Sequence, residues 1–90
     1  MEKNFNILII EDDELLNDMI KRLLTQYGYD VTSAYSGSEA LLLIERSSFD
    51  LILLDLMLPG IPGETVLEKL KNTMDIPIIG VSAKTDIDSK

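Results

Sequence analysis

The chain contains no cysteine and no histidine. Without cysteine there is no disulfide framework, no thiolate zinc site and no thiol nucleophile. Without histidine there is no Ser-His or Cys-His catalysis and no histidine-based metal site. Any chemistry must therefore come from carboxylates, hydroxyls, lysines and backbone groups. The lack of cysteine fits a reducing compartment, and we expect the protein to be cytoplasmic.

Basic residues are also few. Eight Lys and Arg stand against 16 Asp and Glu, which gives a net charge of −8, and the longest basic cluster is the pair Lys21-Arg22. Nucleic acids and anionic membranes are bound mainly through basic side chains, so we expect no direct contact with either. The N-terminus leads into four apolar residues and then three acidic ones, and we expect neither a signal peptide nor a membrane span there.

Proline and glycine are scarce, at three and five residues. Hydrophobic residues make up 46% of the chain and charged residues 27%, which is typical of a packed globular domain. A length of 90 residues is too short for two separate cores. We therefore predict a single domain over residues 1–90, with no second, output domain.

Unbroken apolar runs predict three buried strands, because a strand covered on both faces of a parallel sheet shows no polar alternation. These runs are residues 7–10, 51–54 and 76–81. Residues 29–34 form a shorter, more polar run, which predicts a further strand at an edge.

Helices are predicted between these strands. Apolar residues at three- and four-residue steps predict one helix from Asp13 to Gly28. A capping box at Ser36 and Glu39 begins a second helix, and a third follows the breaker segment 59–63. We expect this helix to carry one apolar stripe along its length, and we expect Met19 and Met57 to lie in or near the core. The stripe consists of Leu15, Leu16, Met19, Ile20, Leu23, Leu24 and Tyr27. The alternation of strands and helices predicts an α/β fold with a parallel sheet and helices on both faces.

Acidic residues directly follow two of the buried runs. Glu11, Asp12 and Asp13 follow the first run, and Asp55 follows residues 51–54. Ligands of an open parallel sheet bind beyond the carboxyl ends of its strands. Converging carboxylates repel one another unless a cation lies among them, and an all-oxygen set selects a hard ion such as Mg²⁺. A carboxylate beside such an ion can itself accept a phosphoryl group, and Asp55 is the best-placed nucleophile.

Each of these residues also has a purely structural explanation. Acidic residues at a helix start commonly cap the helix, and for the triplet alone this explanation is about as good as a metal site. Asp55 as a loop carboxylate and Ser82 as a turn residue are the corresponding alternatives. The site is favoured because acids or hydroxyls end three buried strands at one edge, where Ser82, Ala83 and Lys84 follow the last run.

Three segments carry a resemblance to a known family. They are residues 7–13 (ILIIEDD), residues 50–60 (DLILLDLMLPG) with Gly63, and residues 78–83 (IIGVSA). Together, and in this order, they resemble the receiver domain of bacterial two-component response regulators, the CheY-like domain. The resemblance implies a flavodoxin-like sheet with strands in the order 2-1-3-4. It also implies a signalling domain rather than an enzyme, with at most slow self-dephosphorylation.

The resemblance assigns a role to each matching residue. Asp55 looks like the acceptor of a phosphoryl group from a phosphohistidine on a sensor histidine kinase. Glu11, Asp12 and Asp55 look like ligands of Mg²⁺, with Glu11 acting largely through water, and the backbone carbonyl of Met57 completes the protein's share of the metal shell. The hydroxyl of Ser82 and the backbone beside the small Ala83 would contact the phosphoryl oxygens.

The sequence departs from the family pattern at its C-terminal end. The family continues through a fifth strand and a fifth helix, and its phosphate-contacting lysine ends that fifth strand; neither Lys84 nor Lys90 matches it. We therefore expect a truncated receiver domain with impaired switching. An uncovered apolar edge near Ile76–Val81 and an uncovered sheet face favour association, so we expect a homo-oligomer, and specifically a two-fold dimer.

Functions of other classes stay open. One is an assembly module, a self-associating receiver fragment without phosphorylation activity. Another is a carboxylate-and-metal phosphohydrolase, but haloacid-dehalogenase-like and topoisomerase-primase-like domains need Asp-x-Asp after a strand, where this chain has Glu11-Asp12-Asp13 and Asp55-Leu56-Met57. A dinucleotide-binding domain needs a glycine-rich turn after the first strand, and this chain has acids there.

Overall fold

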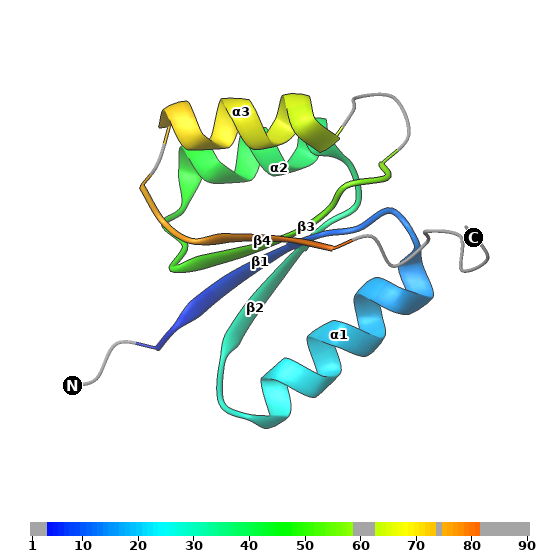
Figure 1. Cartoon of the computed structure of the whole chain (residues 1–90). Helices are drawn as coiled ribbons and strands as arrows, with labels where there is room; N and C mark the ends of the chain where they lie inside the picture. The colour runs from blue at the N-terminus through cyan, green and yellow to red at the C-terminus, as the bar shows by residue number, and fades with distance from the viewer. Residues whose placement is uncertain (1–3, 59–62, 74, 82–90) are drawn as a thin grey trace.

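A computed structural model describes residues 4–58, 63–73 and 75–81. Strands and helices alternate along this part of the chain (Figure 1), as predicted. The elements are β1 (Asn6–Ile10), α1 (Glu14–Gln26), β2 (Asp30–Ala34), α2 (Gly37–Arg46), β3 (Leu51–Asp55), α3 (Gly63–Thr73) and β4 (Ile78–Val81). The predicted elements are therefore confirmed with small shifts of their ends; Pro77 precedes β4 rather than lying in it.

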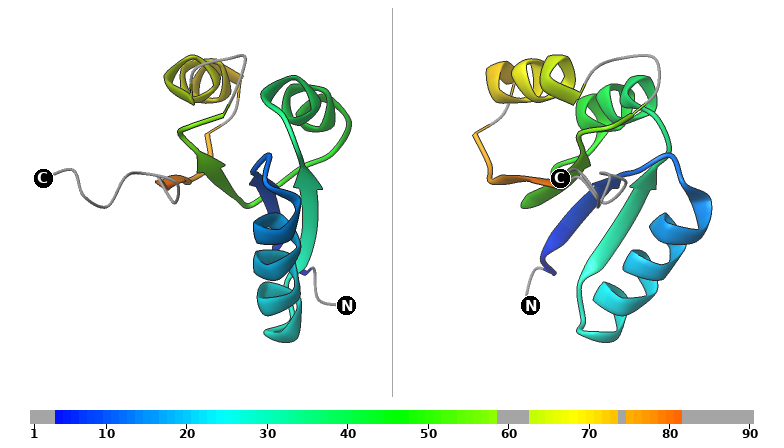
Figure 2. Two further views of the ribbon diagram at one scale, coloured as in Figure 1. Left: turned by 90° about the vertical axis from the view of Figure 1, so that its right-hand side faces the viewer. Right: turned by 45° about the vertical axis from the view of Figure 1, so that its right-hand side comes forward.

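The four described strands form one parallel sheet in the order β2-β1-β3-β4. The chain begins in the middle of the sheet, adds β2 on one side and then crosses to the other side for β3 and β4. Because crossovers between parallel strands are right-handed, this reversal places α1 on one face of the sheet and α2 and α3 on the other (Figure 2). The predicted α/β fold and strand order are confirmed.

The larger core lies between the sheet and the pair α2 and α3. Leu8 pairs with Ile52 and Ile10 with Leu54, so alternate residues of the two central strands point to this side. The core residues are Leu8, Ile10, Ala34, Ala40, Ile44, Phe49, Ile52, Leu54, Leu58, Val66 and Leu70. The predicted N-cap at Ser36 is present, since the Ser36 hydroxyl accepts from the N–H of Glu39 at 3.1 Å. The Glu39 carboxylate accepts from the N–H of Tyr35 at 2.9 Å, one residue before the Ser36 N–H of an ideal capping box.

The position of α1 corrects one prediction. Four residues of its apolar stripe are exposed: Leu15 by 83%, Met19 by 62%, Leu23 by 53% and Tyr27 by 73%. The placement of Met19 in or near the core was therefore wrong. The physical reason is that the apolar residues of α1 cover more than one helix face, while the helix packs on β1 and β2 with a single face.

The end of α1 depends on Gly28. This residue has a φ of +93°, and its N–H donates to the carbonyl of Thr25 at 2.9 Å. A side chain is strained in this left-handed conformation, so the sequence correctly indicated a helix end at this glycine. Within the described ranges, no helix is long and apolar enough to cross a membrane.

Candidate metal and phosphoryl-acceptor site

The predicted acidic cluster forms at the carboxyl ends of β1 and β3. Glu11 and Asp12 directly follow β1, and Asp55 is the last residue of β3. Because Ile10 pairs with Leu54, the residues after them emerge side by side. One carboxylate oxygen from each of Glu11, Asp12 and Asp55 lies within 4.8 Å of the other two. The two central strands of the sheet therefore bring the three carboxylates together.

Hydrogen bonds hold the turn after β1. The N–H of Glu11 donates to the carbonyl of Ala34 at 3.0 Å, which extends the β1–β2 pairing by one residue. The carboxylate of Glu11 accepts from the N–H of Asp13 at 2.9 Å. Asp13 in turn caps α1, since its side chain accepts from the N–H of Leu16 at 3.2 Å. The capping explanation therefore holds for Asp13, while Glu11 and Asp12 lie in the cluster.

Asp55 is held by the turn that follows β3. It is fully buried, and its Oδ1 accepts from the N–H of Met57 at 2.9 Å. The N–H of Leu56 donates to the carbonyl of Val81 at 2.9 Å, so β4 supports the same turn. The side chain of Met57 is 51% exposed, and its predicted place in or near the core is wrong. The turn directs this side chain outward while its backbone bonds Asp55.

The electrostatics of the cluster favour a cation. Glu11 and Asp55 are 2% and 0% exposed, so water screens the repulsion between these carboxylates only weakly. An all-oxygen set without nitrogen or sulfur ligands suits Mg²⁺, which typically takes one or two carboxylates and keeps several waters. The carboxylate oxygens of Glu11, Asp12 and Asp55 therefore fit the ion that the sequence pattern suggested.

Two predicted phosphate-contacting residues, Ser82 and Ala83, lie outside the described residues, as do Lys84 and Lys90. Sequence reasoning missed one residue beside the cluster, Asn17. This side chain is fully buried in α1 and bonds the backbone carbonyl of Glu11. The available signal was a polar residue directly after Leu16 in an apolar helical pattern, where asparagine is a poor helix former.

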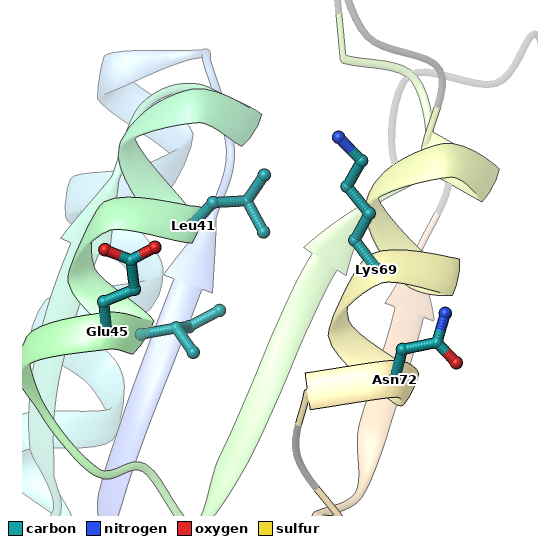
Figure 3. Close-up of a pocket in the computed structure, with 5 residues that line it drawn as sticks. Leu41, Glu45, Lys69 and Asn72 are labelled. Carbon is teal, nitrogen blue, oxygen red and sulfur yellow. The ribbon is translucent and has the colours of Figure 1, made fainter.

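A separate cleft of about 300 Å³ lies between α2 and α3 (Figure 3). Leu41, Ile44 and Glu45 of α2 line it together with Lys69 and Asn72 of α3. None of the acidic cluster residues takes part. The cleft is thus a groove between two neighbouring helices, apart from the carboxyl ends of the strands.

The geometry agrees with comparisons to known proteins. The family model of the response regulator receiver domain matches residues 7–90. The Bacillus subtilis transcriptional regulatory protein YbdJ is 38% identical over 89 residues. That match covers 98% of this chain and 39% of YbdJ, so the chain spans well under half the length of this relative. The chain belongs to the response regulator receiver domain family.

Solved structures of the family have the same fold. The receiver domain of the Francisella response regulator 1452 is 34% identical with a TM-score of 0.83, and the match covers 97% of this chain and 73% of that chain. A second match is to the crystal structure of the histidine kinase ThkA in complex with the response regulator protein TrrA. The matched chain is 30% identical in sequence to this chain, with a TM-score of 0.83, and the match covers 96% of this chain and 75% of that chain. Receiver domains are signalling proteins rather than classical enzymes, and they generally bind Mg²⁺.

Proposed function

We propose that this chain accepts a phosphoryl group on Asp55 from a phosphohistidine of a sensor histidine kinase. The observation that carries the proposal is the convergence of Glu11, Asp12 and Asp55 within 4.8 Å at the carboxyl ends of β1 and β3. Asp12, Asp55 and the backbone carbonyl of Met57 would hold Mg²⁺ directly, with Glu11 acting largely through water. Ser82 and the backbone of Ala83 would contact the phosphoryl oxygens, as in the family.

The proposed step needs little covalent chemistry from the protein. A carboxylate oxygen of Asp55 attacks phosphorus, the bond from phosphorus to the donor's histidine nitrogen breaks, and an acyl phosphate forms on Asp55. Phosphoryl transfer depends mainly on alignment and on neutralising charge. Mg²⁺ supplies the charge neutralisation at the phosphoryl oxygens when it is bound.

Residues of this chain would supply the alignment. The hydrogen bond from the N–H of Met57 fixes one oxygen of Asp55 and so limits rotation of the carboxylate. The N–H of Asp13 does the same for Glu11. Both bonds come from backbone donors in turns that the sheet anchors, so the carboxylates are oriented before a donor arrives.

The first experiment measures the intact mass of the chain after incubation with acetyl phosphate. We expect a gain of one phosphoryl group with Mg²⁺ present and no gain when EDTA removes the metal. Asp13→Asn is the matched control, because asparagine also caps a helix and Asp13 lies outside the cluster; its labelling should equal that of the unchanged chain. Equal labelling with and without metal would contradict the proposed role of the carboxylates.

A second candidate function is self-association. Leu53 pairs with Ile79, so the two share the sheet face that α1 partly covers. On this side Ile79 is 48% exposed and Val81 is 37% exposed, and Leu15, Met19, Leu23 and Tyr27 of α1 are exposed as well. Exposed apolar surface favours association. The surface supports a homodimer formed through β4, near Ile76–Val81.

Sedimentation velocity over a range of protein concentrations tests this second candidate. We expect the mass to rise with concentration, and we expect Ile79→Lys to return the chain to a monomer, because a charge placed in an apolar interface must be desolvated. Leu42→Lys is the matched control, since Leu42 is 57% exposed on α2, on the opposite side of the sheet. A monomer at every concentration would contradict the proposed dimer.

A further inference from the structure

We infer that Asn17 is a positioning residue that sets the orientation of the Glu11–Asp12 peptide and thereby the two metal-ligating carboxylates on either side of it. The role in metal binding rests on the proposed function, whereas the hydrogen bonds of Asn17 do not depend on it. Asn17 is fully buried, with 0% of its surface exposed to solvent, and it is the only buried residue among those described in α1.

Every polar atom of the Asn17 side chain is engaged. Its Nδ2 donates to the carbonyl of Glu11 at 2.9 Å and to the carbonyl of Ala34 at 3.2 Å. Its Oδ1 accepts from the hydroxyl of Ser33. One side chain of α1 thus joins the end of β1 to the end of β2. Such a fully satisfied buried network specifies a single arrangement of the elements that it connects.

The bond to Glu11 matters because of where that carbonyl lies. A peptide unit is planar, so the carbonyl of Glu11 and the N–H of Asp12 turn together as one rigid group. The side chains of Glu11 and Asp12 leave the backbone on either side of this group. A hydrogen bond that fixes the carbonyl therefore fixes the directions in which both carboxylates start.

The opposite flank of the same turn is held independently. The N–H of Glu11 donates to the carbonyl of Ala34, and the N–H of Asp13 donates to the carboxylate of Glu11. The hydrogen bond from Asn17 acts on the carbonyl of Glu11, which neither of these two bonds reaches. Removing the amide leaves β1 paired with β2 but takes this restraint away from the Glu11–Asp12 peptide. The loss should therefore be local to the acidic turn.

Three variants separate positioning from general stability. Asn17→Leu keeps the branching and the number of side-chain heavy atoms, is larger in volume, and removes all three hydrogen bonds. Asn17→Ser is smaller and serves as the deciding variant if the leucine variant does not fold. Ser33→Ala removes only the hydroxyl that donates to Asn17 and leaves both bonds from Nδ2 in place, so it is the matched control.

The first readout is amide hydrogen exchange of the metal-free protein. We expect both Asn17 variants to lose protection at the N–H of Asp13, with little change at the N–H of Leu54 in the sheet, and Ser33→Ala to keep both. The second readout is Mg²⁺ affinity by titration calorimetry. We expect the Kd to rise roughly 10-fold in the Asn17 variants, as for other residues that orient metal ligands, and to change less than about twofold in Ser33→Ala.

The outcomes are distinct. Unchanged protection at Asp13 in a folded Asn17 variant, or an equal loss of protection at Asp13 and Leu54, would overturn the positioning role. An equal loss of Mg²⁺ affinity in Ser33→Ala would overturn it as well, because the bond to Glu11 is intact there. If the unchanged chain binds no Mg²⁺, the proposed function fails, while the exchange result still decides whether Asn17 orients the turn.

Discussion

Asp55→Asn is expected to take up no phosphoryl group from acetyl phosphate, whether or not Mg²⁺ is present. The amide oxygen is a far weaker nucleophile than a carboxylate oxygen, and the amide nitrogen does not attack phosphorus. Asparagine keeps the shape of the side chain, and its Oδ1 can still accept from the N–H of Met57, as that of Asp55 does. The fold should therefore persist while the acceptor is lost.

The same variant has an expected effect on stability. Asp55 is fully buried and lies within 4.8 Å of two other carboxylates. Replacing it with a neutral isostere removes like-charge repulsion, so the melting temperature of the metal-free protein should rise. Added Mg²⁺ should then stabilise the variant less than the unchanged chain, because the ion has lost a ligand.

Intact mass and thermal unfolding, each measured with and without Mg²⁺, check both expectations. Asp13→Asn is the control, because it removes one acidic charge from the same region, outside the cluster, and keeps the cap on α1. Labelling of Asp55→Asn at the level of this control would show that another residue accepts the phosphoryl group. A lower melting temperature of the metal-free variant would contradict the proposed repulsion.

Leu70→Ala is expected to destabilise the fold by about 2–5 kcal/mol, which is the usual cost of truncating a buried leucine and leaving a cavity. Leu70 is fully buried in α3 and belongs to the core beneath α2 and α3. Domains of this size are stable by about 5–15 kcal/mol in total. The variant should therefore lose a large share of the free energy of unfolding.

Leu42→Ala is the matched control, since it makes the same change in a helix at a position that is 57% exposed. Its free energy of unfolding should change by no more than about 0.5 kcal/mol, as for most surface substitutions. Urea unfolding followed by circular dichroism measures both variants. A similar loss in the two variants would contradict the placement of Leu70 in the core.

The strands and the acidic cluster could be predicted because they depend on patterns within short segments. Residues 7–10 and 51–54 are apolar without interruption, as central strands of a parallel sheet are. Glu11 and Asp55 follow them directly, and the ends of parallel strands meet at one edge. Burial on both faces and the direction of the chain are thus sufficient to bring these carboxylates together.

The orientation of α1 and the role of Asn17 could not be predicted in the same way. Apolar residues lie on more than one face of α1, and local periodicity does not say which face meets the sheet. Packing on β1 and β2 half-buries Leu16 and Ile20 and leaves Leu15 and Met19 exposed. The choice of face decides that Asn17 is buried, where it bonds carbonyls from two different strands.

Local sequence patterns predict the α/β alternation, the parallel sheet and the edge at which Glu11, Asp12 and Asp55 meet. Each of these follows from hydrophobic burial along a short segment and from the handedness of the crossovers. Which face of α1 is covered, and which of its side chains bonds the acidic turn, become clear only from the packing of the folded chain. Those choices depend on contacts between residues far apart in the chain, such as Asn17 with Ala34, and no local pattern records them.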